Sequence, residues 1–99
     1  MLNLTSGQRR FLRAQAHSLS PVILIGDAGL TAGVMKEIEH SLNSHELLKI
    51  KVAGNDRGLR ENMLTEICTV LETAPVQHIG KTLVIYKPAN KPRLILPKS

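Results

Sequence analysis

The stretch from Val22 to Thr31 constrains the fold more than any other part of the chain. Four apolar residues over 22–25 are followed by Gly26-Asp27-Ala28-Gly29 and then by Thr31, a residue type that often begins helices. This order predicts a strand, a tight turn and a helix. The two glycines let the backbone bend sharply and let another molecule approach it closely. An anion such as a phosphate would be stabilised there by the helix dipole, although a Gly-x-x-Gly turn is also common as an ordinary connection.

A first helix is predicted to begin at Thr5. The segment Thr5-Ser6-Gly7-Gln8 has the form of a capping box, in which the Thr and Gln side chains each bind a backbone N–H of the other residue. The helix buries Leu12, Ala16 and Leu19 and leaves a basic stripe on another face. The stripe consists of Arg9, Arg10, Arg13 and His17. Such a stripe is either a solvated face or a surface for nucleic acid.

Two further helices are predicted downstream. The second begins after Thr31 and ends at Asn43-Ser44. The third follows a loop over 54–58 and is stopped by Pro75. Its predicted inward residues are Leu59, Met63, Ile67, Val70, Leu71 and Ala74.

Strand patterns alternate with these helices. The segment over 22–25 is apolar on both faces, which predicts a central strand. In the next strand Leu48, Ile50 and Val52 alternate with two lysines, so one face is buried and the other is basic. Gly80-Lys81 fits a two-residue hairpin turn between strands over 76–79 and 82–87.

We predict one α/β domain over residues 1–99, with a core over 4–88 and an extended tail over 89–99. A chain of 99 residues is long enough for a single core. The order α-β-α-β-α-β-β and right-handed crossovers predict a mixed four-stranded sheet packed with three helices, its first three strands parallel. Pro88, Pro92 and Pro97 leave room only for an edge segment over 94–96.

The predicted topology also places a site. Ligands gather beyond the carboxyl ends of parallel strands. Here those ends lead into Gly26–Gly29, Asn55–Arg60 and Gly80–Lys81. The first helix should run antiparallel to the first strand and so bring Arg9 and Arg10 to the same end. This convergence strengthens the prediction of a phosphate site.

The composition favours a polyanionic partner. A net charge of +5 and a pI near 9.8 attract nucleic acid first, with a membrane surface as the lesser alternative. The acids fall mainly on the second and third predicted helices, so we expect a two-faced domain. No apolar run approaches the roughly 18–20 residues of a membrane span, and the start of the chain lacks a secretory pattern, so we expect a cytoplasmic protein.

No catalytic or metal-binding constellation is visible in the sequence. His40 and His45 lie about 140° apart around a helix, which does not suit a shared metal ion. Cys68 is the single cysteine and fits a small core residue rather than a reactive thiol. Phe11 and Tyr86 are the only aromatic residues, so a platform for stacked bases is absent. We therefore expect no enzyme activity and no cofactor.

Several motifs in order resemble the CRM domain family, and within it the stand-alone bacterial YhbY-like members. They span residues 4–97 and are Leu4-Thr5, Ala16-His17, Pro21-Val22, Ile25–Thr31, His45–Lys51, Val76–Gly80 and Leu83–Pro88. The resemblance implies an RNA-binding fold similar to the C-terminal domain of translation initiation factor three. It also implies that Gly26–Gly29 is the RNA-contacting loop and that the protein associates with precursors of the large ribosomal subunit.

The chain departs from the family pattern in two places. Asp27 brings a negative charge into the turn where relatives often have a basic or polar residue. Either Asp27 points away and pairs with a neighbouring arginine, or the loop contacts RNA less tightly than in relatives. The Thr73-Ala74-Pro75 junction lacks a glycine, which bears on the turn there and not on the fold.

The predicted partner is structured RNA, recognised through phosphates and shape, with large-subunit precursor ribosomal RNA as its source, and the protein is expected to be a monomer without a membrane partner. The predicted RNA-binding residues are Gly26, Asp27, Ala28, Gly29, Arg9, Arg10, Arg13, Lys49, Lys51, Arg57, Arg60 and Lys81. The alternative is an adaptor on ribosomal particles that docks on ribosomal proteins through its acidic helices and has only weak, non-specific affinity for RNA.

Overall fold

Three helices and four strands follow one another in the predicted order in the computed structural model, which describes residues 1–99. The elements are α1 Ser6–Ala16, β1 Ile23–Ile25, α2 Ala32–Ser41, β2 Leu47–Val52, α3 Arg57–Leu71, β3 Ala74–Ile79 and β4 Thr82–Tyr86. None of the three helices is both long enough and apolar enough to cross a bilayer.

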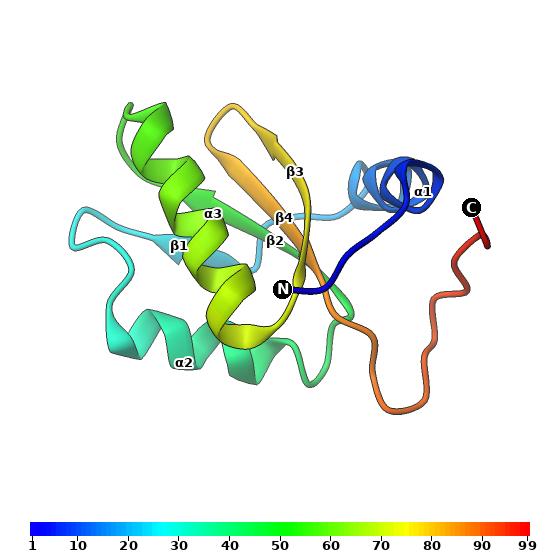
Figure 1. Ribbon diagram of the computed structural model, residues 1–99. Coiled ribbons are helices and arrows are strands. Elements are labelled where there is room, and N and C mark those ends of the chain that lie inside the picture. Colours follow the sequence, from blue (N-terminus) through cyan, green and yellow to red (C-terminus); the bar gives the residue numbers. More distant parts are fainter.

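The strands form one mixed sheet in the order β1-β2-β4-β3. β1 is parallel to β2, and β4 is antiparallel to both β2 and β3, so β1, β2 and β3 all run in one direction. The helices cover both faces, with α1 on one side and α2 and α3 on the other (Figure 1). The predicted α/β architecture is therefore confirmed.

The alternation along β4 separates two cores. Leu83 and Ile85 pack with α2 and α3 in the larger cluster, which also contains the buried side chains of β1 and β2. Val84 and Tyr86 point to the other face and pack with Leu12 and other residues of α1. The sheet is thus the middle of three layers.

Helix starts are set by their capping residues, as predicted. The Thr5 hydroxyl accepts the N–H of Gln8 at 3.1 Å, and the Gln8 side chain accepts the N–H of Thr5 at 3.0 Å, which completes the capping box. Thr31 caps α2 by accepting the N–H of Val34 at 3.2 Å. Gly80 has a φ of +55°, which glycine adopts readily in the predicted hairpin turn.

The prediction that the first strand is central is wrong. β1 pairs with β2 alone and lies at an edge of the sheet. Ile23 and Ile25 are buried against α2 and α3, whereas Leu24 points to the opposite face and is 63% exposed. A strand with three apolar residues can therefore remain uncovered on one side, because α1 does not extend over β1.

The inner face and the end of the third helix also differ from expectation. Leu59 and Val70, predicted to face inward, are 50% and 59% exposed, while Arg60 is buried. The helix ends at Leu71 because Glu72 adopts a left-handed conformation with φ of 55°. Ala74 and Pro75 consequently belong to β3, an edge strand with an irregular register next to the proline, where a missing N–H is tolerated.

The tail after β4 forms no strand over 94–96, in contrast to the prediction of an edge segment there. Leu94 and Leu96 instead pack against the core beneath α1. The Gln8 side chain donates to the carbonyl of Pro97 at 3.0 Å. The tail is therefore fixed against the first helix.

Candidate nucleic-acid interface

The Gly26–Gly29 turn projects from the end of β1 and leads directly into α2, at the left edge of the molecule in the view of Figure 1. The N–H of Gly29 donates to the carbonyl of Gly26 at 3.0 Å, which closes the turn. Gly29 has a φ of +78°, a conformation that favours glycine. Gly26, Asp27 and Ala28 are exposed.

Behind the turn, the first amides of α2 have no partner in the chain. Thr31 binds the N–H of Val34, whereas the N–H groups of Ala32 and Gly33 form no hydrogen bond within the protein. Both residues are exposed. Together with the positive end of the helix dipole, these two free N–H groups favour an anion at this position.

The strand ends that were predicted to meet are joined by hydrogen bonds. The N–H of Ala53, just after β2, donates to the carbonyl of Ile25 at 2.8 Å. The N–H of Val52 donates to the carbonyl of Lys81 at 2.8 Å. The Gly turn, the loop before α3 and the hairpin turn therefore lie at one end of the sheet. Lys51 and Lys81 are exposed there.

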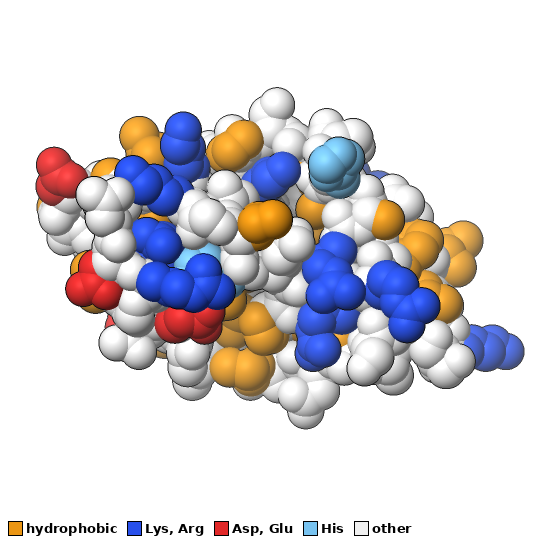
Figure 2. All heavy atoms as spheres, turned by 90° about the horizontal axis from the view of Figure 1, so that it is seen from above, with side chains coloured by type: hydrophobic (Ala, Val, Ile, Leu, Met, Phe, Trp, Pro, Cys, Tyr) orange, Lys and Arg blue, Asp and Glu red, His pale blue; other side chains and the backbone are white.

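The arginines of α1 lie toward β3, at the far edge of the sheet from the Gly turn, rather than beside the turn. Arg9 and Arg13 line an open hollow of about 460 Å³ with Glu61 and with residues 75–78 of β3. β3 is the edge strand farthest from β1, three interstrand spacings or roughly 14 Å across the sheet. In Figure 2 the Lys and Arg side chains accordingly form two groups, one at the left with acidic side chains among them and one at the right over α1.

Arg60 lies inside the protein. It is 7% exposed, and its Nε donates to His78 Nε2 at 3.1 Å while Nη1 donates to the carbonyl of Gly54 at 3.4 Å. Since His78 Nε2 accepts this bond, its Nδ1 is the protonated nitrogen and donates to Glu61, 2.5 Å away. Arg60 therefore joins α3, β3 and the preceding loop, and its guanidinium is turned away from solvent.

The other predicted cations differ in how freely they can reach a ligand. The Lys49 ammonium donates to the carbonyls of Ala16 and Leu19, each at 3.2 Å, and so caps the end of α1. Arg57 has an exposed side chain with Glu61 3.9 Å away. Arg10 is exposed on α1. Asp27 forms no ion pair, so the suggested pairing with a neighbouring arginine does not occur.

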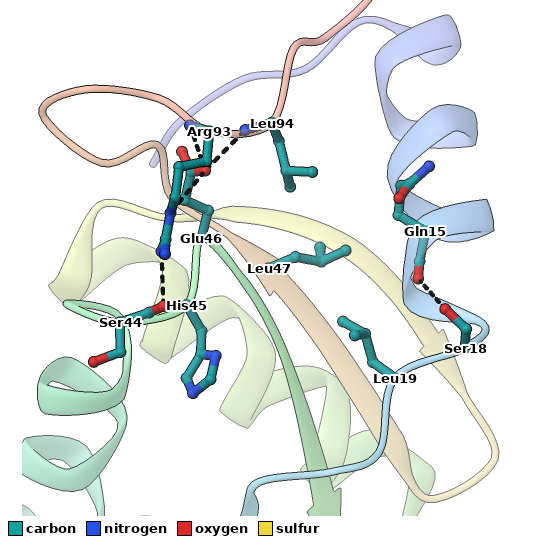
Figure 3. A pocket seen from close by; sticks show the side chains of 9 residues that line it. All are labelled: Gln15, Ser18, Leu19, Ser44, His45, Glu46, Leu47, Arg93 and Leu94. Atoms are coloured by element: carbon teal, nitrogen blue, oxygen red, sulfur yellow. Dashed lines mark hydrogen bonds and ion pairs between the residues drawn. The ribbon is translucent and has the colours of Figure 1, made fainter.

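A second concave region lies at the opposite end of β2 (Figure 3). This pocket of about 320 Å³ is lined by Leu19, Leu47 and Leu94 together with several polar residues, among them Glu46. The Glu46 carboxylate is 3% exposed and accepts N–H bonds from Ala89, Arg93 and Leu94 at 3.0, 2.8 and 2.9 Å. Its oxygens are thus occupied by the tail.

No three His, Cys, Asp or Glu side chains come together as metal ligands would. Cys68 is fully buried in the larger core, as predicted, and burial raises the pKa of its thiol. The remaining candidate is therefore the surface around the Gly turn.

Comparison with known proteins identifies the family. The sequence profile of the CRS1/YhbY (CRM) domain matches residues 4–87. This chain belongs to the CRM family. An RNA-binding protein of Haemophilus influenzae is 44% identical to this CRM chain over 98 residues, which cover 99% of each. The Bacillus subtilis protein named "Probable RNA-binding protein YqeI" is 33% identical over 92 residues, 93% of this chain and 96% of its own.

A solved structure has the same fold as this CRM domain. The solution structure of a hypothetical protein from Staphylococcus aureus superposes with a TM-score of 0.85 at 30% sequence identity. The match covers 96% of this chain and 100% of the other. The helix and strand arrangement described above is thus shared with that protein.

Two features of this CRM domain were missed by sequence reasoning. The buried role of Glu46 has no local signal, because its partners lie more than 40 residues away in the tail. The exposure of Leu24 and Ile79 was not predicted, because apolar residues in a short strand fit buried positions equally well.

Proposed function

We propose that this CRM domain binds structured RNA and that the Gly26–Gly29 turn holds one backbone phosphate at the start of α2. The two unpartnered N–H groups of Ala32 and Gly33 are the observation on which the proposal rests. Backbone amides at a helix start bind phosphate without reading a base. The names of the relatives from Haemophilus influenzae and Bacillus subtilis support RNA as the source of that phosphate.

Exposed cations extend the contact. Three exposed cations lie near the turn. Lys51 and Lys81 are at the same end of the sheet, and Arg57 begins α3 just after the loop that leaves that end. The arginines of α1 would contact phosphates farther along the RNA, because they lie toward β3. A partner that reaches both groups must be long and folded, which favours a structured RNA over a short strand.

The proposed partner is ribosomal RNA in a precursor of the large ribosomal subunit, bound by a monomeric cytoplasmic protein. This assignment follows from the family resemblance and from a net charge of +5. Gradient sedimentation of the tagged protein from cell extract, with sequencing of the bound RNA, tests it. Recovery of other transcripts, or sedimentation away from large-subunit precursors, would contradict this part of the proposal.

The turn itself is tested by Gly26→Asp. An ideal Cβ on Gly26 meets no atom within 4 Å, and its φ is not positive, so the substitution should fold normally. Gly29 is less suitable because its φ of +78° would add strain to any substitution. The new carboxylate should repel a phosphate and weaken binding to a structured RNA by about tenfold, or about 1.4 kcal/mol.

Two matched variants isolate the charge. Gly26→Asn has nearly the same shape without the charge, and Asn43→Asp adds the same charge at an exposed residue after α2. Both should bind RNA within about twofold of wild type, since neither adds a charge at the turn. Equal affinity of wild type and Gly26→Asp, measured by fluorescence anisotropy on a folded protein, would remove the turn from the interface.

The adaptor alternative makes a different forecast. A domain that docks on ribosomal proteins would still recover them after the RNA in the extract has been digested. RNA binding predicts that nuclease treatment releases these proteins from the tagged domain. Pull-down with and without nuclease therefore separates the two functions.

A further inference from the structure

α1 covers only part of its face of the sheet. Pairing across the four strands aligns Leu24 with Lys51, Lys51 with Thr82, and Thr82 with Ile79. These four residues form a row, here called the open row, at the end of the sheet next to the Gly turn. Leu24 and Ile79 are 63% and 57% exposed, and Lys51 is exposed as well.

The adjacent row shows why the open row stays uncovered. There Val84 is fully buried beneath α1, and Lys49 is bonded to the end of that helix. The helix ends at Ala16, and the ammonium of Lys49 binds the carbonyl of that last residue. The open row lies one step farther along each strand, on the same face as Val84 and Lys49.

We propose that the open row receives unpaired nucleotides of the RNA, a step that rests on the proposed function of the Gly turn. The row continues directly from that turn, since Leu24 precedes Gly26 by two residues and Thr82 follows the hairpin turn. An RNA strand held at the turn would therefore meet these side chains next.

The chemistry of the row suits a nucleotide. It offers an aliphatic side chain at each end, an ammonium and a hydroxyl between them, and no carboxylate. Aliphatic groups can cover the face of a base, while Lys51 and Thr82 can bind a phosphate or the edge of a base. In an A-form duplex the base faces are stacked and inaccessible, so only unpaired nucleotides can use the apolar ends.

The dimensions disfavour a protein in this place. The row is roughly 14 Å long, from three interstrand spacings, and it adjoins the exposed side chain of Val22 at its β1 end. A stable protein interface needs about 800 Å² from each partner, far more than four side chains provide. The exposed Lys51 between the apolar ends also complements an anionic strand.

The test compares two RNA hairpins with the same stem, one fully paired and one with a short bulge of unpaired adenines. Fluorescence anisotropy should show that the wild-type protein binds the bulged hairpin about tenfold more tightly. The double variant Leu24→Thr with Ile79→Thr should lose this preference and bind the paired hairpin within about twofold of wild type. Threonine keeps the preference for strand structure, so the variant should fold.

The control is Val70→Thr, which likewise replaces an exposed aliphatic residue by threonine, at a residue that is 59% exposed on α3. It should keep the preference for the bulge. Leu24→Thr alone is a second variant, should the double variant be unfolded, and should reduce the preference by about threefold through loss of one of the two aliphatic contacts.

Three outcomes would overturn the inference: no preference by the wild type, an undiminished preference in the folded double variant, or loss of a protein partner from that variant with RNA binding unchanged. Failure of the proposed function is recognised separately, because Gly26→Asp would then bind the paired hairpin as well as wild type does. A wild type that distinguishes the hairpins only through Leu24 and Ile79 supports the inference.

Discussion

Arg57 and Arg60 both lie in the first turn of α3, yet their surroundings assign them different roles. The Arg57 side chain is exposed, and its nearest acid, Glu61, is 3.9 Å away. Arg60 is buried and bonded to His78 and to the carbonyl of Gly54. A buried guanidinium that keeps these bonds stabilises the fold, whereas an exposed one is available to phosphate.

Replacing each arginine by methionine should separate the two roles. Arg60→Met should lower the free energy of unfolding by about 2 kcal/mol, because it leaves His78 and Gly54 without their donor. Arg57→Met should change it by less than about 0.5 kcal/mol, since an exposed ion pair contributes little. Urea denaturation measures both values. Equal losses in the two variants would contradict this division.

RNA affinity provides the complementary readout. Arg57→Met should weaken binding by about threefold, the effect of one exposed phosphate contact. Arg60→Met, measured below its unfolding transition, should bind within about twofold of wild type if Gly54 keeps its place. A larger loss with Arg60→Met would mean that this residue positions the loop for RNA.

For the helices and strands, local sequence signals predicted well where a helix begins, but they predicted poorly which face of a helix or strand is buried. The caps at Thr5 and Thr31 depend on contacts within three residues, so the sequence contains all the information. Which side chains of α3 are buried depends on how the helix is rotated against the sheet. Leu59 was expected to be buried and is exposed, whereas its neighbour Arg60 is buried. The edge position of β1 depends on strand order, which a short apolar segment does not encode.

The tail and the start of β2 are joined by one buried carboxylate. Burial raises the pKa of Glu46, but the N–H bonds from Ala89, Leu94 and Arg93 and the charge of Arg93 together bring the pKa below the usual 4.5. The folded form therefore holds its charge to lower pH than the unfolded chain does. Such a group stabilises the fold above the unfolded pKa and loses that contribution as the pH falls through the folded pKa.

We expect Glu46→Gln to lower the free energy of unfolding by about 1–3 kcal/mol at neutral pH, because the amide group turns a donor toward backbone N–H groups. The difference from wild type should narrow as the pH falls below 4.5, where the wild-type carboxylate begins to lose its advantage. Urea denaturation at a series of pH values tests this. Glu66→Gln, at an exposed residue of α3, is the control. A difference that is independent of pH would argue against the carboxylate.

For the whole molecule, the distribution of positive charge over the surface determines where an RNA can be bound. The net charge of +5 and the basic tail were evident from the sequence, but the separation of the α1 arginines from the Gly turn was not. That separation follows from β4, which inserts between β2 and β3 and moves β3 to the far edge. An RNA would have to span the sheet to reach both cationic areas on this face.

The salt dependence of binding counts the phosphates in contact. Roughly five to seven neutralised phosphates predict a slope of log K against log salt between about −3.5 and −6.

If α1 contributes its own contacts, the triple variant Arg9→Gln, Arg10→Gln and Arg13→Gln should make the slope less steep by about 2. A variant with Lys36→Gln, Lys87→Gln and Lys91→Gln removes the same charge from exposed residues elsewhere and should change the slope by less than about 0.5. If both triple variants flatten the slope equally, RNA responds only to the overall charge and α1 is not part of the interface. A selective effect of the α1 variant would place the β1 and β3 edges of the sheet on the same RNA.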